Sequence, residues 1–210
     1  MSESEVKDSL GNFSELVAAA TPTPGGGSVA AHAAELAASL GQMICNISIG
    51  KKKYLDVEPR LVEIKGELER LGARLRELVS IDAESFEAVL AAYRLPKETT
   101  DEQAARKEAV RSAGRAAVYT PLETAERASE VLGLLAEVGK IGNQNAFSDV
   151  TVGAQLASLV VRGAFYNVGV NLEMLEDAEE AGRLRQLMTE MIESARKTAD
   201  QIEAEMMTKI

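Results

Sequence analysis

One acidic residue lies on an otherwise apolar helical stripe, which makes it a candidate for acid–base chemistry. The stripe recurs in steps of three and four and comprises Leu61, Ile64, Leu68, Leu71, Leu75 and Leu78. The next position is Asp82, after which we expect Phe86 and Val89 to resume the apolar face. A carboxylate there would be held in a buried ion pair, exposed by a helix bend, or used as a general acid and base whose pKa is tuned by burial. We favour the last interpretation.

Three consecutive lysines, Lys51, Lys52 and Lys53, follow an apolar run and precede Tyr54. Lysines near a helix C-terminus interact favourably with the helix dipole, so a solvated cluster is one interpretation. The other is a local cationic patch that captures an anionic ligand with the help of Tyr54.

Polar side chains gather in the segment GNQNAFSD, residues 142–149. Ser148 or Asp149 could cap the apolar helix that follows, while the amides of Asn143 and Asn145 have no such role. Asn167 and Asn171 share a helix face further along the chain. These amides could either join neighbouring helices or bind the hydrogen-bonding edge of a ligand.

The segment TPTPGGGS, residues 21–28, places Pro24 and three glycines, Gly25, Gly26 and Gly27, directly before a helical run. A tight turn with Ser28 as the helix N-cap is the structural interpretation. The alternative is a binding edge, because glycine lets a ligand approach the backbone and the first amides of a helix attract polar atoms.

Composition excludes several other functions. A formal net charge of −10 argues against a nucleic-acid partner, since such binding depends on neutralising phosphates. His32 is the only histidine, which argues against a histidine-rich metal site and a Ser-His-Asp triad, so we expect no metal. We assign His32 either to packing or to the support of a residue that touches the ligand. The single Cys45 in an apolar run, with no signal peptide before it, is typical of a packing residue in a cytoplasmic protein.

These residues must be positioned by helices, because we find no convincing strand. The predicted helices cover residues 3–20, 29–49, 59–93, 101–119, 122–140, 148–175 and 176–207. We therefore predict one all-α domain over residues 1–210, folded as an up-and-down helical bundle.

Two predicted helices contain long stretches that are almost free of charge, residues 29–49 and residues 150–172 within the helix 148–175. The second is long enough to span a bilayer, but polar residues within it argue against insertion and against a membrane partner: Gln155, Arg162, Asn167 and Asn171. Helices that are apolar all round occupy the centre of an assembly. Two of them need more burial than a monomer of this size provides, which predicts a homodimer.

Five motifs in order resemble one known family. They are PTPGGGSVAA, CNISIGKKKY, DAESF with YRLPK, GNQNAFSD, and NVGVNL, spread over residues 22–172. Together they resemble the formiminotetrahydrofolate cyclodeaminase/methenyltetrahydrofolate cyclohydrolase family. CNISIGKKKY and GNQNAFSD are most similar to the stand-alone bacterial methenyltetrahydrofolate cyclohydrolases, since the fused cyclodeaminases tend to carry arginines at the positions of Lys51 and Lys52.

The resemblance implies an all-helical dimer with a tetrahydrofolate derivative as substrate and no prosthetic group. In the implied reaction, 5,10-methenyltetrahydrofolate is hydrolysed to 10-formyltetrahydrofolate. Asp82 aligns with the carboxylate that moves protons, and we group Lys51 with it as catalytic. Lys51 and Lys52 would bind the glutamate carboxylates or orient water, with Tyr54 beside them. The pterin would be bound by the polar groups Asn143, Asn145, Asp149 and Asn167, with Pro24, Gly25, Gly26, Gly27 and Ser28 in the pocket wall.

Two alternatives remain at this point. The first is cyclodeamination of 5-formiminotetrahydrofolate with release of ammonia, which needs the same pocket and one proton-transferring group. The second is a non-catalytic folate-binding helical protein. Whether the pocket belongs to one subunit or two is left open by the sequence.

Overall fold

The computed structural model describes the backbone of residues 3–210 and the side chains of residues 11–210. Its elements in chain order are α1 (Glu3–Ala18), α2 (Gly26–Ser48), η1 (Lys52–Tyr54), α3 (Glu58–Tyr93), α4 (Thr100–Ile141), η2 (Gln144–Ala146), α5 (Phe147–Asn171), η3 (Leu172–Leu175) and α6 (Ala178–Met207). The all-α prediction is confirmed, since residues 3–210 contain no strand. None of the helices over these residues is both long and apolar enough to cross a membrane.

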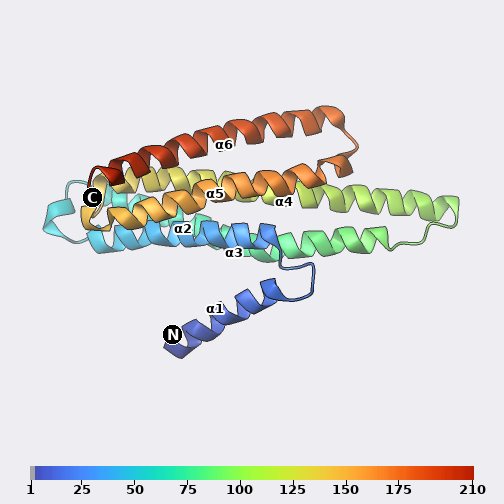
Figure 1. The fold of residues 1–210 in the computed structure, drawn as a ribbon, viewed down its shortest axis with the longest axis horizontal. Helices are drawn as coiled ribbons and strands as arrows, with labels where there is room; N and C mark the ends of the chain where they lie inside the picture. Colours follow the sequence, from blue (N-terminus) through green and yellow to red (C-terminus); the bar gives the residue numbers. More distant parts are fainter. Residues whose placement is uncertain (1–2) are drawn as a thin grey trace.

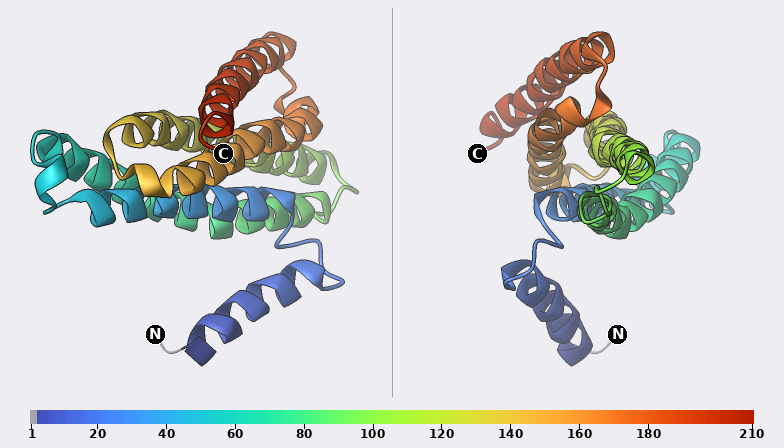
Figure 2. Two further views of the ribbon diagram at one scale, coloured as in Figure 1. Left: turned by 60° about the vertical axis from the view of Figure 1, so that its left-hand side comes forward. Right: turned by 90° about the vertical axis from the view of Figure 1, so that its right-hand side faces the viewer.

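Helices α2 to α6 run up and down alongside one another, as Figure 1 shows. In that view α2 and α5 form the nearer pair and α3 and α4 lie behind them, with α6 along the top. Helix α1 leaves the bundle on the opposite side from α6. Seen along the bundle axis, α2 and α5 lie on the same side of the molecule (Figure 2, right).

The leucine stripe on α3 packs into the core as predicted. Leu61, Leu68 and Leu78 are fully buried, and Val89 is only 4% exposed. The expectation for Phe86 is wrong, because its side chain is 41% exposed. The alternation of three and four continues from Asp82 to Ser85, which is buried and satisfies its hydroxyl by donating to the Ile81 carbonyl at 2.7 Å.

The two helices predicted on either side of Pro121 form one continuous helix, α4. Proline has no N–H to donate to the carbonyl four residues earlier, which here is that of Ala117. Asn171 Nδ2 of α5 donates to this carbonyl oxygen instead, at 2.9 Å. The acceptor left by Pro121 is therefore satisfied from a neighbouring helix, and Asn171 joins two helices.

The predicted caps of α2 and α5 are also wrong. Gly25 is the N-cap of α2, and Ser28 lies inside the first turn, where its hydroxyl is directed elsewhere. Ala146 is the N-cap of α5, so neither Ser148 nor Asp149 caps it. Cys45 is fully buried in the core, as its apolar surroundings predict, and burial raises the pKa of its thiol to about 11.

Candidate active site

Asp82 is held against the start of α2 by a serine. Ser28 Oγ, which is fully buried, donates to Asp82 Oδ2 at 2.9 Å, and the backbone N–H of Ser28 also bonds the carboxylate. Asp82 itself is half-buried. Across residues 11–210, no lysine or arginine forms an ion pair with Asp82, in contrast to the buried ion pair weighed from the sequence.

Burial and hydrogen bonding act on Asp82 in opposite directions. Burial raises the pKa of the carboxyl group, because it penalises the charged form, while the two bonds from Ser28 favour the charged form and lower it. Burial is the larger influence, so the pKa lies above its ordinary value. A carboxyl group with a raised pKa is a stronger base than an ordinary carboxylate and, once protonated, can return the proton.

Of the three consecutive glycines, Gly27 is the one that lies against the Asp82 carboxylate. A Cβ on Gly27 would lie 2.1 Å from Asp82 Oδ1, so no side chain fits between α2 and the carboxylate. A Cβ on Gly26 would meet no atom within 4 Å, and one on Gly25 would meet only the Pro22 carbonyl at 3.4 Å. Contacts inside the chain therefore require glycine at position 27, but not at positions 25 and 26.

Residues 51–54, which contain the three lysines and Tyr54, and the polar segment 142–149 meet at the C-terminal end of α2. Tyr54 is buried, and its hydroxyl donates to Asn143 Oδ1 at 3.5 Å. The same oxygen accepts from the backbone N–H of Asn145 at 3.1 Å, while the N–H of Asn143 donates to Ser48 Oγ at 2.9 Å. The three lysines are exposed around this cluster, with Lys53 Nζ 5.4 Å from the centroid of the Tyr54 ring.

One copy of the chain does not bring all the predicted residues together. Ser28 and Ser48 lie about 20 residues apart on α2, and a rise of about 1.5 Å per residue separates them by about 30 Å. At the N-terminal end of α2, which we call the glycine end, lie Pro24, Gly25, Gly26, Gly27, Ser28 and, from α3, Asp82. Near its C-terminal end, which we call the lysine end, lie Lys51, Lys52, Tyr54, Asn143, Asn145 and Asp149. Asp149 is half-buried in the first turn of α5.

Asn167 lies apart from the other polar residues with which the sequence grouped it. Helix α5 runs antiparallel to α2, and a Cβ on Gly153 would lie 3.5 Å from the Ala37 carbonyl oxygen. Asn167 is about 14 residues further along, so it lies about 21 Å from Gly153 toward the glycine end. Its Nδ2 donates to the Gly163 carbonyl of its own helix at 3.0 Å.

His32 takes part in packing and in a small polar network. Its Nδ1 lies 3.1 Å from Glu35 Oε2, and its ring meets that of Phe13 edge-on with the centroids 5.2 Å apart. Glu35 is only 8% exposed and its other oxygen accepts from Arg76 Nε at 2.6 Å. Within the described side chains, no three His, Cys, Asp or Glu residues are grouped so that they could hold a metal ion.

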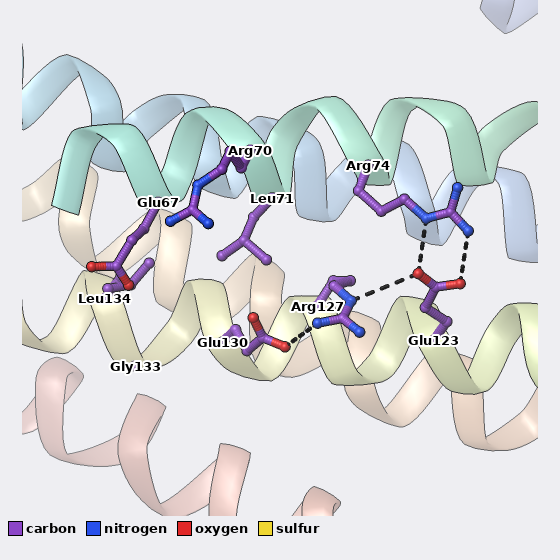
Figure 3. A pocket seen from close by; sticks show the side chains of 9 residues that line it. All are labelled: Glu67, Arg70, Leu71, Arg74, Glu123, Arg127, Glu130, Gly133 and Leu134. Atoms are coloured by element: carbon purple, nitrogen blue, oxygen red, sulfur yellow. Dashed lines mark hydrogen bonds and ion pairs between the residues drawn. The ribbon is translucent and has the colours of Figure 1, made fainter. Parts of the chain in front are cut away.

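Two surface hollows are relevant to the location of a ligand. One of about 590 Å³ lies between α3 and α4 and contains none of the predicted site residues (Figure 3). Ion pairs across and beside it, such as the two bonds from Arg74 to Glu123 at 2.8 and 2.9 Å, join the two helices. The other hollow, of about 720 Å³, lies beside the glycine end.

Residues not predicted from the sequence line this second hollow. Thr23 Oγ1 donates to Glu87 Oε1 at 3.3 Å, which fixes the turn before α2 against α3. Glu84 and Arg94 lie along the same wall. The motifs TPTPGGGS, DAESF and YRLPK contain Thr23, Glu84 and Arg94, but the types and spacing of these residues predict no role for them. Glu87 lies outside the motifs, five residues after Asp82 on α3.

Comparisons with known proteins agree with the arrangement of helices. The model of a family described as Formiminotransferase-cyclodeaminase matches residues 9–190. The chain is 39% identical over 183 residues to a methenyltetrahydrofolate cyclohydrolase of Methylorubrum extorquens, covering 86% of this chain and 87% of that protein. It is 33% identical to the formimidoyltransferase-cyclodeaminase of Rattus norvegicus over 91% of this chain but 35% of the rat protein. The crystal structure of a formiminotetrahydrofolate cyclodeaminase from Thermotoga maritima matches with a TM-score of 0.71 and 29% identity, covering 90% of this chain and 89% of that one.

Proposed function

This chain belongs to the formiminotransferase-cyclodeaminase family, and we propose that within it the chain is a methenyltetrahydrofolate cyclohydrolase. The enzyme hydrolyses 5,10-methenyltetrahydrofolate to 10-formyltetrahydrofolate in one-carbon metabolism, with the folate as substrate and no prosthetic group. The similarity to the Methylorubrum extorquens cyclohydrolase extends over most of both chains. By contrast, the chain spans about a third of the length of the rat relative.

The observation that carries the proposed chemistry is the Asp82 carboxyl group with its raised pKa, fixed by Ser28 against Gly27. The substrate is a cationic amidinium, so a carboxylate without a basic partner favours its binding. We assign Asp82 as the proton-transferring residue. Ser28 orients the carboxylate, and Gly27 leaves it the space it occupies.

The reaction proceeds in two proton transfers at Asp82. Water adds to the bridging carbon, forming a C–O bond, while the carboxylate of Asp82 accepts a proton from the water. The neutral tetrahedral intermediate then collapses: the new hydroxyl loses its proton to solvent, the carbonyl forms and the C–N5 bond breaks. Asp82 returns its proton to N5, which leaves 10-formyltetrahydrofolate and restores the carboxylate.

The remaining predicted residues bind the substrate. Lys51 and Lys52 are exposed, as groups that bind the glutamate carboxylates or orient water would be. Asn143, Asn145 and Asp149 at the lysine end would bind donors and acceptors of the pterin, and Asn167, which lies toward the glycine end, keeps the same proposed role. Gly25 and Gly26, which nothing inside the chain requires, leave bare backbone for a flat ligand.

We also propose that residues 1–210 act as one domain in a cytoplasmic homodimer. The exposed apolar side chains on α2 and α5 support the dimer, and the single buried cysteine is compatible with a reducing compartment.

Turnover of the two folate substrates tests the proposal. With purified protein, we expect hydrolysis of 5,10-methenyltetrahydrofolate, followed by its absorbance, at a much higher kcat/KM than cyclodeamination of 5-formiminotetrahydrofolate. The opposite ratio would make the chain a cyclodeaminase, an alternative favoured by the Thermotoga maritima structure of a chain of similar length. Folate binding without turnover of either substrate would leave a non-catalytic folate-binding protein.

A further inference from the structure

The orientation of the Asn143 side-chain amide is fixed by a backbone group. The backbone N–H of Asn145 donates to one side-chain atom of Asn143 at 3.1 Å. Because a backbone N–H can only donate, the atom that it meets must be the carbonyl oxygen Oδ1 and not the amide nitrogen. The hydroxyl of Tyr54, which is buried, donates to the same oxygen at 3.5 Å. The acceptor of this amide is therefore already in use.

The turn that carries Asn143 is held in place by two neighbouring helices. The backbone N–H of Asn143 donates at 2.9 Å to the hydroxyl of Ser48, which is fully buried in α2. The side chain of Gln144 donates from Nε2 to the Gly139 carbonyl of α4 at 2.8 Å. Lys209, which follows α6, donates to Oε1 of Gln144 at 3.3 Å. A side chain on such a turn loses little conformational freedom when a ligand binds.

The two hydrogens on Asn143 Nδ2 remain for a ligand. Over residues 11–210, Nδ2 has no hydrogen-bond partner. Asn143 is half-buried, but none of the fully buried polar side-chain atoms of these residues lacks a partner, so Nδ2 must be accessible from outside. Asn143 therefore offers a ligand donors only, and it requires an acceptor such as a carbonyl oxygen.

Asp149 offers the opposite kind of group close by. It lies in the first turn of α5, six residues after Asn143, and the helical turns between them place the two Cα atoms about 10 Å apart. The half-buried Asp149 has no hydrogen bond or ion pair to its side chain from any residue in 11–210, so its carboxylate is also accessible. An ionised carboxylate only accepts, and its two oxygens can bind two neighbouring N–H groups.

We propose that Asn143 and Asp149 recognise the pyrimidine edge of the pterin by the order of its hydrogen-bonding groups. The inference rests on the proposed function, which makes a tetrahydrofolate the ligand. This edge presents the 2-amino group, N3–H and the 4-carbonyl in a row, that is, two donors followed by an acceptor. Asp149 accepts from the 2-amino group and N3–H, and Asn143 Nδ2 donates to the 4-carbonyl oxygen. Both are specificity-determining residues and neither transfers a proton.

The glutamate carboxylates of the substrate are the other acceptors available to Asn143. A carboxylate bound there would lie near Asp149, and two like charges that share a partly buried site repel each other. The exposed lysines, residues 51–53, can bind a carboxylate in solvent without this repulsion. A neutral carbonyl oxygen has no such penalty, so the pterin edge is the better match for Asn143.

A 4-amino analogue of the ligand tests this assignment. In 4-amino-4-deoxytetrahydrofolate an amino group replaces the 4-carbonyl, so that a donor meets the donor on Asn143. We expect the wild type to bind tetrahydrofolate at least about tenfold more tightly than this analogue, because an unmatched buried group costs about that much. Isothermal titration calorimetry gives the Kd of each ligand. Equal affinities in the wild type would overturn the inference.

Asn143→Asp reverses the hydrogen-bonding character of the accessible atom. The variant keeps one oxygen for Tyr54 and Asn145 and replaces Nδ2 by a second oxygen, which accepts from the 4-amino group. The preference for tetrahydrofolate is expected to disappear or reverse. Because the preference compares two ligands on one protein, it does not depend on how much of the variant is folded.

The matched control is Gln201→Glu, which makes the same chemical change at an exposed amide on α6, outside the predicted site. It is expected to keep the wild-type preference. If Asn143 instead binds a glutamate carboxylate, which both ligands carry, Asn143→Asp would weaken both by the same factor. An unchanged preference in that variant would therefore overturn the inference.

Asp149→Asn tests the other half of the pair. It is expected to weaken tetrahydrofolate binding at least about tenfold, because one of the two acceptor oxygens becomes a donor facing an N–H group. Asp56→Asn, at an exposed position, is the control and should bind as the wild type does. Unchanged affinity of Asp149→Asn would overturn the inference.

These outcomes are separable from those that test the proposed function. Wild-type turnover of 5,10-methenyltetrahydrofolate, together with an unchanged preference in Asn143→Asp, would overturn the pterin assignment alone. Absence of tetrahydrofolate binding by the wild type would refute the proposed function and the assignment with it.

Discussion

The Asp82 carboxylate lies directly against the Cα of Gly27, so that a single added methyl group would stand 2.1 Å from Oδ1. The acid on α3 and the glycine on α2 are thus parts of one contact, which explains why position 27 of the glycine run carries no side chain. This contact gives the most direct test of the site.

Gly27→Ala is expected to displace the carboxylate and reduce kcat by about 100-fold, since displacing a reacting group by about 1 Å has effects of that size. Gly66→Ala is the matched control, because a Cβ on Gly66 of α3 meets nothing within 4 Å. The kcat of each variant is measured by steady-state kinetics with 5,10-methenyltetrahydrofolate as substrate. Equal activity of the two variants would show that the position of Asp82 does not matter.

Ser28→Ala is expected to shift the acidic limb of the kcat/KM pH profile to higher pH. The Ser28 hydroxyl bonds the charged carboxylate and so lowers the pKa of Asp82, and its loss lets burial raise that pKa further. More of the enzyme is then protonated, and inactive as a base, at a given acidic pH. Ser129→Ala, whose hydroxyl bonds only the Ala125 carbonyl in its own helix, serves as the control. A limb that stays in place, or moves to lower pH, contradicts the assignment.

Asp82→Asn is expected to reduce kcat by at least about 100-fold while stabilising the fold at neutral pH. Because burial raises the folded-state pKa of Asp82, the charged form destabilises the folded state above that pKa. The penalty disappears as the pH falls below the ordinary value of about 3.8, where the group is protonated in both states. The melting temperature of the variant should therefore exceed that of the wild type at pH 7, and the difference should shrink in acid. Asp56→Asn, at an exposed position, is the control. A gain that is the same at both pH values would refute this explanation.

Asn171→Ala is expected to lower the free energy of unfolding by about 1 to 3 kcal/mol, because the Ala117 carbonyl then has no partner in place of the N–H that Pro121 lacks. In a Pro121→Ala background the main chain supplies that N–H, so the same change should have a smaller effect. Urea unfolding of the wild type, the two single variants and the double variant gives the interaction energy between positions 121 and 171. Additive effects would mean that the amide does not compensate for the proline.

The helical fold could be predicted from the sequence because its apolar residues keep a constant spacing. The leucine stripe on α3 is buried as expected, and the inward position after Asp82 is Ser85 because the alternation of three and four outweighs the hydrophobicity of Phe86. The continuity of α4 through Pro121 could not be predicted, since it depends on Asn171, which lies 50 residues away in the sequence. Helix propensity depends only on residues close together in the sequence, so it does not include such a contact.

The site divides in the same way. That Asp82 faces inward follows from the spacing of the leucine stripe, whereas the contact between Tyr54 and Asn143 is seen only in the structure. The placement of the two groups at opposite ends of α2 does not follow from motifs, because motifs give their order along the chain and not the distance between them in space. The separation of the two groups is seen only once the helices are placed antiparallel to one another in the structure.

The fully buried Cys45 has a practical consequence. With the pKa of its thiol raised to about 11, almost no thiolate is present at neutral pH, and the sulfur is shielded from reagents. The unmodified chain can therefore serve as the background for cysteine scanning, in which single cysteines placed along residues 29–47 are alkylated one at a time. The pattern of protected and reactive positions would map the covered face of α2 without a crystal.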